Sequence, residues 1–536
     1  MTHGGIMANS AQADTEADAT LEKLGVKQEL QRNFSRVSML GLAFAILNSW
    51  TALAASLSLA LPSGGPSAIL WGLITAGICN LCLAASLAEF LSAWPTAGGQ
   101  YHWVAIISWK RSSRAISYST GWINTAAWVC LTATGGLLGS DLIGGIISLL
   151  NPSYEPKSWH QFLIYIAYTL AAFFLNAFAN RLLPYFNKAA FLWSLAGFTI
   201  ICITVLSCAT PNYQSASFVF GGFINDVSWP DGLAWMLGLL QGAFALTGFD
   251  ATVHMIEEIP RPQIEGPKIM LYAICIGMFT GFIFLTCLLF VLKDVNVVIE
   301  SAAGPLLQIL YDATNNKAGA VCLLMFPVVC MLFTTTSIMT TSSRMSYAFA
   351  RDRGLPASRV FAQVHKGLDV PLNALIWTTV WVIIFGCVFL GSDSAFNAIT
   401  AASVVALGVT YAIPPAINVM RGRKMLPESR AFKMPEWLGW FTNLVGIGWT
   451  LLTTVLFVFP PEQPVTGTNM NYAVVPFGVV LLIAIVQWLT DGRKNYEGPI
   501  IDAEVFGVGK DVVEGVSGGE SKPSGDETIE SKAVDQ

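Results

Sequence analysis

The chain has 536 residues, of which 54% are hydrophobic and 12% are charged, and its formal net charge at pH 7 is -5. Soluble globular domains carry roughly 25% charged residues, so this composition excludes a soluble globule and predicts an integral membrane protein. The net charge by itself says nothing about partners, and no surface for nucleic acid is visible in the sequence.

Apolar segments long enough to cross a bilayer recur between residues 34 and 490. Crossing a hydrocarbon core of about 30 Å takes around 20 apolar residues in a helix, whereas the strands of a membrane barrel alternate over about ten residues. These runs do not alternate, so we predict an all-α integral membrane fold with 12 transmembrane helices. Their centres lie near Leu47, Thr75, Trp128, Tyr168, Ile200, Gly242, Thr280, Met331, Thr379, Leu407, Thr450 and Leu481.

The polar tails and the basic residues predict the topology. Residues 1–33 and 491–536 lack apolar runs, so both are predicted to be disordered. Membrane proteins concentrate Lys and Arg in their cytoplasmic loops. If the N-terminus is cytoplasmic, the outer loops hold only Lys157, Lys293 and Lys317 of the 29 Lys and Arg residues. Both termini are therefore predicted to be cytoplasmic.

The ten cysteines all lie in or at the edge of apolar segments, and none falls in a predicted outer loop where an oxidising compartment would pair it. We interpret them as small packing residues. The CxxC at Cys79 and Cys82 has no further His or Cys partner of the kind a metal site needs. The sequence therefore predicts no metal and no cofactor.

Polar and aromatic residues mark segments one, three and five. The first segment carries the polar island NSWT, residues 48–51, at its centre. Its Asn and Ser either hydrogen-bond to neighbouring helices or mark an interruption of the helix. Trp128, in segment three, would either wall a cavity or pack between helices. Lys188, in segment five, is expected to extend toward the inner surface, which leaves it a secondary candidate for ion coupling.

The second segment ends in the motif AEFLSAWPTAGGQYHW, residues 88–103. Pro95, Gly98 and Gly99 predict a re-entrant bend before Tyr101. Glu89, at the inner end of the segment, either anchors a neighbouring helix or carries a proton, and anchoring is the favoured interpretation.

The sixth segment, residues 235–260, is interrupted in its middle by Ala245-Leu246-Thr247-Gly248. Asp250 and His254 follow directly beyond the interruption. Ionisable groups at membrane depth are costly, and unpaired backbone groups are tolerated there only where they line a polar cavity. We therefore predict that this stretch forms half of a solute-binding site.

The eighth segment carries hydroxyls at mid-depth in Thr334, Thr335 and Ser337. Such hydroxyls ordinarily bond to their own helix backbone, but so dense a cluster is also a candidate site for a cation or for water. The segment continues as SRMSYAFARDRGLP, residues 343–356, which is a basic helix end closed by glycine and proline.

The motifs AEFLSAWPTAGGQYHW and SRMSYAFARDRGLP, together with Pro371 at the start of segment nine, resemble the amino acid, polyamine and organocation transporter superfamily. Within it, LNSWTAL in segment one, SGGP at residues 63–66 and GFDATVHMIEEIPRP in segment six resemble the fungal amino acid and choline transporter family. That family includes choline permeases and 4-aminobutyrate permeases. The resemblance covers residues 34–490 and does not choose the substrate.

The resemblance implies a five-plus-five inverted repeat with broken helices 1 and 6 and two extra helices. It also implies alternating access and, for most fungal relatives, uptake coupled to protons. The N-termini of the half-helices would meet a polar end of the substrate, such as a carboxylate. The substrate-binding candidates are Asn48, Ser49, Trp50, Thr51, Trp128, Phe244, Thr247, Gly248, Phe249 and Asp250.

Roles remain open at the two ionisable residues. Asp250 is either the countercharge for a substrate amine or the cap of the second half-helix, and nearby aromatic rings would cage a choline-like cation. His254 either relays protons or simply pairs with Asp250. The coupling-ion candidates are His254, Thr334, Thr335, Ser337 and Lys188; the gate or structural candidates are Glu89, Pro95, Gly98, Gly99, Tyr101, Glu258, Arg344, Arg351 and Asp352.

We therefore predict a multi-pass plasma-membrane permease that imports a small nitrogenous solute by proton symport. The predicted partners are the solute, either an amino acid such as 4-aminobutyrate or a choline-like amine, together with the proton and the lipid bilayer. The alternative is a nutrient sensor that keeps the fold without transport. An enzyme is not expected, because no nucleophile, base and orienting group converge in the sequence.

Overall fold

The computed structural model describes residues 34–47, 49–467, 469–496 and 498–499, so the predicted N-terminal tail and residues 500–536 lie outside it. The described residues form helices and no β-strand, with only the isolated bridges Ser63–Asn225 and His365–Val370. Eleven helical stretches among them are long and apolar enough to cross a membrane. The predicted all-α membrane architecture is thereby confirmed at the level of its helices.

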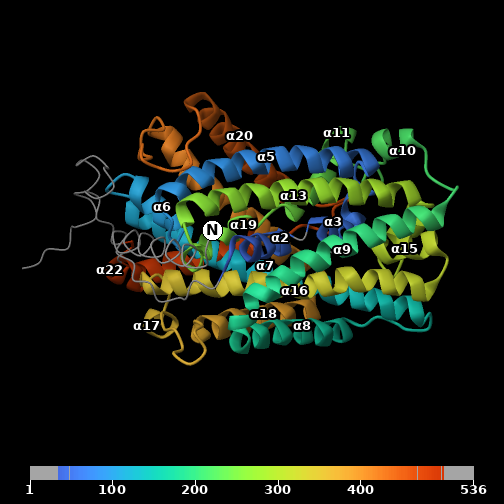
Figure 1. Ribbon diagram of the computed structural model, residues 1–536, viewed down its shortest axis with the longest axis horizontal. Helices are drawn as coiled ribbons and strands as arrows, with labels where there is room; N and C mark the ends of the chain where they lie inside the picture. The colour runs from blue at the N-terminus through green and yellow to red at the C-terminus, as the bar shows by residue number, and fades with distance from the viewer. Residues whose placement is uncertain (1–33, 48, 468, 497, 500–536) are drawn as a thin grey trace, which may run out of the picture.

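The helices form one bundle, whose long members run along the horizontal axis of Figure 1. The long helices are α5 (Gly65–Ala93), α7 (Ser113–Leu150), α8 (Ser158–Phe178), α9 (Leu183–Ala209), α13 (Pro262–Val291), α16 (Lys317–Arg351), α18 (Leu372–Gly391), α19 (Asp393–Met420), α20 (Glu436–Leu456) and α21 (Val474–Gln487). The shorter ones are α2 (Arg36–Leu47), α3 (Ser49–Ala55), α4 (Leu57–Ala60), α6 (Gln100–Ile107), η1 (Asn180–Leu182), α10 (Ala216–Gly221), α11 (Asp231–Ala245), α12 (Ala251–His254), η2 (Ile256–Glu258), α14 (Val295–Glu300), α15 (Pro305–Thr314), α17 (Ser358–Phe361), η3 (Trp488–Gly492) and α22 (Arg493–Asn495).

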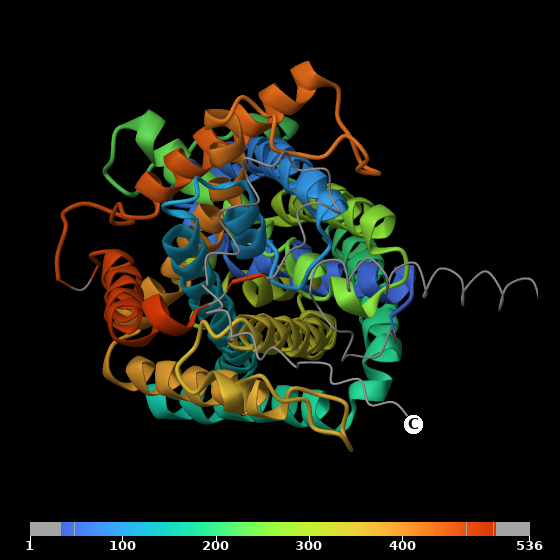
Figure 2. The same ribbon diagram turned by 90° about the vertical axis from the view of Figure 1, so that its left-hand side faces the viewer.

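The two ends of the bundle differ in charge. In Figure 1, α6, α17 and α22 lie at one end, and α10 and α15 lie at the other. We call the first the basic end, because the connections at residues 108–114, 351–366 and 421–433 are rich in Lys and Arg. Figure 2 views the bundle from this end and shows α8 and α18 side by side along one edge.

The sixth segment is interrupted as predicted. α11 ends at Ala245 and α12 begins at Ala251, and Gly248 between them has a φ of 98°, in the left-handed region that favours glycine. Neither piece is long enough to span a membrane, so this segment is not one of the eleven. The interruption of the first segment stays a prediction, because Asn48 lies outside the described residues. The count of 12 helices and the inverted repeat also stay predictions.

The bend predicted after the second segment is also present. α5 ends at Ala93, and α6 begins at Gln100 after a loop. Gly99 in this loop has a φ of 56°, and a Cβ atom there would lie 2.5 Å from Cγ1 of Val253 in α12. Glycine is therefore needed for the loop to approach the sixth segment so closely.

The predicted start of the C-terminal tail at residue 491 is wrong. Residues 488–495 continue the last membrane helix as η3 and α22, and Tyr496 is fully buried. The Tyr496 hydroxyl lies 2.7 Å from Oγ of Ser117 in α7. Burial of the tyrosine ring provides the physical reason, since an aromatic side chain buried against α7 holds this segment on the bundle.

Candidate functional site

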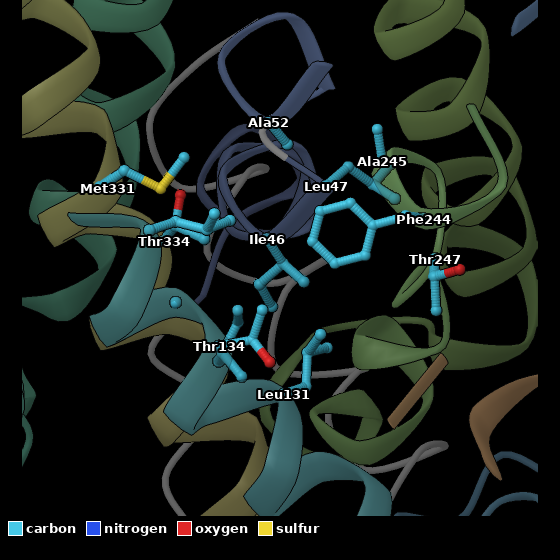
Figure 3. Close-up of a pocket in the computed structure, with 13 residues that line it drawn as sticks. Ile46, Leu47, Ala52, Leu131, Thr134, Phe244, Ala245, Thr247, Met331 and Thr334 are labelled. Atoms are coloured by element: carbon cyan, nitrogen blue, oxygen red, sulfur yellow. The ribbon is translucent and has the colours of Figure 1, made fainter. Parts of the chain in front are cut away.

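A cavity lies where the interrupted sixth segment meets the first, third and eighth segments (Figure 3). Its empty volume is about 380 Å³, including the part that opens to solvent. The lining draws on both main clusters of buried apolar residues, so the cavity lies at their boundary. The lining residues are Ile46, Leu47, Ala52, Leu131, Thr134, Gly135, Leu138, Phe244, Ala245, Thr247, Met331, Thr334 and Ile338.

This lining is apolar apart from threonine hydroxyls, and none of its members is charged. Figure 3 shows the Phe244 ring beside Ile46 and Leu47. Oγ1 of Thr247 donates to the carbonyl oxygen of Ala243 at 2.8 Å, so this hydroxyl is partly satisfied by the last turn of α11. The cavity is therefore suited to the apolar part of a solute, and polar recognition must come from groups around it.

The predicted residues of the first segment lie in different surroundings. The Trp50 indole donates through Nε1 to Oγ of Ser194 at 2.8 Å, so it is engaged with α9. Ser49 and Thr51 are buried, and within the described part of the chain their hydroxyls have no hydrogen-bond partner. Asn48 lies outside the described residues. Within this island, therefore, the buried hydroxyls of Ser49 and Thr51 are the groups that could accept or donate hydrogen bonds to a solute.

The interruption of the sixth segment places its aromatic neighbours around Asp250. The ring of Phe249 lies 4.7 Å from that of Tyr411 in α19, between ring centroids. The ring of Trp128 in α7 lies 5.8 Å from that of His254 and nearly perpendicular to it. Aromatic rings and polar groups thus meet at one place next to the cavity.

Asp250 is fully buried and is held by three side chains from different elements. Nε2 of Gln100 in α6 donates to Oδ2 at 2.8 Å, and the Tyr411 hydroxyl donates to Oδ1 at 2.5 Å. Nε2 of His254 lies 3.2 Å from Oδ2. The side chain makes no capping hydrogen bond to α12, so the predicted alternative role as a helix cap is not seen.

The partners of His254 fix where its protons lie. Nδ1 is 2.8 Å from the carbonyl oxygen of Ala97, which can only accept, so Nδ1 carries a hydrogen. Nε2 then faces a carboxylate oxygen of Asp250, which without a proton would place two lone pairs against each other. The contact is favourable when one further proton sits between Nε2 and Oδ2. The geometry is therefore that of a pair able to hold a proton.

Asn124 in α7 provides a hydrogen-bond partner for the state in which Nε2 of His254 carries no proton. Its Nδ2 donates to Oε1 of Gln100 at 2.9 Å and lies 3.4 Å from Nε2 of His254. An amide nitrogen has two hydrogens, so the second can be donated to Nε2 once that atom is a lone pair. Gln100 and Asn124 thus connect Asp250 and His254 through uncharged amides that fit both protonation states.

Two ion pairs connect η2 to α16 at the basic end next to this cluster, and we call this connection its closure. Arg351 donates to both carboxylate oxygens of Glu257, at 3.1 and 3.2 Å. Nε of Arg344 donates to Oε1 of Glu258 at 3.0 Å. When one partner of such a carboxylate–guanidinium pair is lost, the remaining charge is left unpaired away from water and the fold is strongly destabilised. The predicted gate residues of segments six and eight are therefore brought together.

Asp352, just beyond α16, joins this closure to α6. The Tyr101 hydroxyl donates to Oδ2 at 2.7 Å, and Nε2 of His102 lies 2.5 Å from the same oxygen. Burial alone would raise the pKa of Asp352, but His102 and Arg351 outweigh it and hold the pKa below its ordinary value. Asp352 is therefore a charged acceptor at the pH of a cell.

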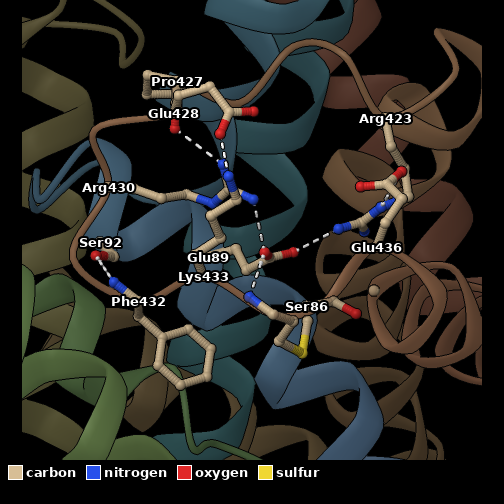
Figure 4. Close-up of polar contacts among 12 residues, drawn as sticks. Ser86, Glu89, Ser92, Arg423, Pro427, Glu428, Arg430, Phe432, Lys433 and Glu436 are labelled. Carbon is tan, nitrogen blue, oxygen red and sulfur yellow. Dashed lines mark hydrogen bonds and ion pairs between the residues drawn. The ribbon is translucent and has the colours of Figure 1, made fainter.

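Glu89 anchors the connection between α19 and α20, the role that its position favoured (Figure 4). It accepts from Nη2 of Arg423 at 2.8 Å and from Nη2 of Arg430 at 2.9 Å. The backbone N–H of Met434 also donates to it, at 3.1 Å. One buried carboxylate therefore ties three points of this connection to α5.

The remaining coupling candidates lie away from the Asp250 cluster. The Thr335 hydroxyl donates to the carbonyl of Met331 in its own helix, and the Ser337 hydroxyl lies 3.4 Å from Oδ1 of Asn187. The Lys188 ammonium lies over the ring of Tyr185, 5.6 Å from its centroid. None of these contacts includes Asp250 or His254, and the roles of these residues in ion coupling stay predictions.

Sequence reasoning missed Gln100, Asn124 and Tyr411. Each is an uncharged polar residue in or beside a membrane segment, where such residues mostly bond to neighbouring helices. Gln100 stands in the AGGQYHW part of a motif that was singled out, so its position carried a signal. Tyr411 carried none, because 161 residues separate it from Asp250.

The chain is similar to known membrane transporters over most of its length. The family model of the amino acid permeases matches residues 34–484. A choline transporter of Saccharomyces cerevisiae is 32% identical over 87% of this chain and 83% of its own length. A putative amino acid/polyamine transporter of Macrophomina phaseolina is 33% identical over 81% and 96%. A swainsonine transporter of Arthroderma benhamiae is 28% identical over 88% and 93%.

Proposed function

We propose a mechanism of import by proton symport and alternating access for this chain, which belongs to the amino acid permease family. The chain is a transporter of small nitrogenous solutes rather than an enzyme. The basic end would face the cytoplasm of a cell whose plasma membrane holds the protein, as the concentration of Lys and Arg there favours. The solute would be an amino acid such as 4-aminobutyrate or a choline-like amine.

The Asp250–His254 pair is the observation that carries the proposal of proton coupling. A transporter needs a group that takes up and releases a proton at membrane depth, and His is suited to this near neutral pH. Nε2 of His254 lies 3.2 Å from Oδ2 of Asp250, and the Asn124 amide can donate a hydrogen bond to Nε2 once the shared proton has left. Both residues are buried, so neither is an ordinary surface charge.

The uncharged cavity beside this pair supports a solute with a compact apolar part. Phe244 and Thr247, which belong to the interruption, line it, while Asp250 lies just beyond them. Asp250 would supply the countercharge for the solute's nitrogen when the cluster opens. Phe244, Phe249, Trp128 and Trp50 remain the candidate aromatic residues for a quaternary ammonium group, which binds over aromatic rings.

Uptake in transport-deficient yeast tests this proposal. Labelled choline, 4-aminobutyrate, ethanolamine and common amino acids are each offered at several pH values, with and without sodium. We expect one of these solutes to accumulate, faster at acidic external pH and independently of sodium. Accumulation that follows sodium and ignores pH would contradict proton symport.

The alternative, a nutrient sensor with the same fold, is tested by the same assay. A sensor would reach the plasma membrane and change a downstream response to the solute without accumulating any member of the panel. Surface labelling must therefore accompany the uptake measurement. Surface expression without uptake of any of these solutes would contradict the transporter.

A further inference from the structure

The loop between α5 and α6 lies between the proton-holding pair and the closed basic end. The carbonyl oxygen of Ala97 accepts from Nδ1 of His254 at 2.8 Å. The N–H of the same residue donates to Oε1 of Glu257 at 3.1 Å. A single residue, Ala97, therefore joins the Asp250–His254 pair on one side to the Glu257–Arg351 ion pair on the other.

The first turn of α6 makes a second connection between the same two places. Gln100 donates to Asp250, while the next two residues, Tyr101 and His102, both contact Oδ2 of Asp352. Nδ1 of His102 also lies 2.8 Å from Oγ1 of Thr96 in the loop. The loop and this turn are thus bonded to each other and to both sites.

Close packing makes this connection stiff. Gly99 approaches Val253 of α12 so closely that no Cβ atom fits between them. Ala97 is buried, and so are Thr96 and Gln100. Movement of His254 in α12 must therefore be followed by the loop, because packed interiors switch between discrete arrangements rather than deform gradually.

We propose that the α5–α6 loop, through the peptide groups of Ala97, and the first turn of α6 transmit the protonation state of the Asp250–His254 pair to the ion pairs that close the basic end. This inference rests on the proposed proton coupling and goes beyond it, because it assigns the residues that convert a proton into a gate movement.

The direction of the effect follows from the geometry. The closed basic end is seen together with an Nε2–Oδ2 contact that a shared proton makes favourable. When water takes that proton, the lone pairs repel, His254 turns toward Asn124, and its bond to Ala97 is disturbed. Ala97 then no longer presents its N–H to Glu257, and the closed end is weakened. By reciprocity, opening the basic end promotes release of the proton there.

Several charged or titratable groups surround this connection and enter its pH dependence. They are Asp250 and His254 themselves, Tyr411 on α19, Tyr101 and His102 on α6, Glu257 and Glu258 on η2, Arg344 and Arg351 on α16, and Asp352 beyond it. Because Glu257 and Glu258 are neighbours with different partners, they provide a matched pair of variants.

Thiol labelling of purified protein in lipid nanodiscs tests the inference without a solute. The reporter is Thr252→Cys in α12, a buried position whose hydroxyl has no partner in the described part of the chain, so the exchange removes no hydrogen bond there. Its maleimide labelling rate is divided by that of Lys366→Cys, an exposed position, to remove the pH dependence of the thiol itself. Labelling of the native cysteines in the unsubstituted protein is subtracted.

We expect this ratio to rise about fivefold or more between about pH 5.5 and about pH 7.5, the lower end of ordinary coupling between sites. In Glu257→Gln, which weakens the bond to the Ala97 N–H, the ratio should be high at both values and change less than about twofold. In Glu258→Gln, which removes a different ion pair from the same end, the ratio should start higher but still rise with pH. If Glu257→Gln fails to fold, Ala97→Pro deletes the same N–H and carries the same expectation.

A wild-type ratio that is flat with pH, or a Glu257→Gln variant that keeps the wild-type dependence, would overturn the inference. Loss of the dependence in Glu258→Gln as well as in Glu257→Gln would also overturn it, since the gate as a whole and not Ala97 would then be responsible. The proposed function fails by a separate result, namely uptake that does not respond to pH.

Discussion

At Asp250, both carboxylate oxygens accept hydrogen bonds from side chains of other elements, Gln100 on α6 and Tyr411 on α19. A buried carboxylate needs this satisfaction, because an unpaired charge in the membrane interior is costly. Only the third contact, to His254, changes character with protonation. The chemistry of the site therefore depends on one histidine against an otherwise fixed carboxylate.

Replacing Asp250 separates its charge from its shape. Asp250→Asn should raise the KM for a cationic solute about tenfold or more, since a charge-assisted hydrogen bond contributes roughly 1.5–3 kcal/mol. Uptake should also stop responding to pH. His254→Gln is the matched variant, expected to lose the pH response with a smaller change in KM. Unchanged kinetics in Asp250→Asn at every pH would remove both roles.

Gly248 is the residue whose backbone conformation makes the interruption possible. Its φ is 98°, and a Cβ atom there would lie 3.1 Å from Cγ2 of Ile46. Gly248→Ala should therefore cost about 1–2 kcal/mol of stability and reduce uptake. Gly144→Ala is the control, because nothing lies within 4 Å of its added methyl group. Equal thermal stability and uptake of the two variants would contradict this account.

Among the elements, those with a local cause were predictable from the sequence. The interruption before Asp250 and the bend at Pro95 and Gly99 follow from residues within the same short stretch. The cluster around Asp250 was not predictable, because 150 residues separate it from Gln100 and hydrogen bonds across helices leave no periodic pattern. The burial of Tyr496 was not predicted for a similar reason. Its neighbours in the sequence are polar, so no apolar pattern marks this one aromatic residue as buried.

The Glu89 anchor predicts a stability effect on the connection between α19 and α20. Glu89→Gln leaves Arg423 and Arg430 without their shared charge, at a cost of about 3–5 kcal/mol. Thermal unfolding of the purified variant measures it. Glu428→Gln, which removes an exposed carboxylate paired with Lys433, should change little. A Glu89→Gln variant that is stable but has lost its pH response would instead indicate a proton carrier.

Asp352 gives a prediction about pH at the closed basic end. Because its folded pKa is below the ordinary value, its pairing stabilises the protein above the unfolded pKa of about 3.9 and is lost only as the pH falls through the lower folded value. Asp352→Asn should therefore lower thermal stability at about pH 5, and this penalty should be smaller at about pH 3, below the unfolded pKa. A penalty that is as large at about pH 3 as at about pH 5 would contradict the assignment.

At the scale of the whole molecule, the cavity, the Asp250–His254 pair and the ion pair of Glu257 with Arg351 follow one another along the sixth segment. This order suits release of solute and proton at the basic end, with the opposite end serving for entry. The composition predicted the membrane class and the helices, while the choice of solute depends on side chains around the cavity that no composition specifies.

The most direct test of this account is proton movement driven by the solute in proteoliposomes. The purified protein is reconstituted with a pH-sensitive dye inside, and the solute that gave the greatest uptake in yeast is added outside without sodium. The account predicts that the interior acidifies as solute enters, and that Asp250→Asn abolishes the acidification. Entry of labelled solute with no change in internal pH would contradict it.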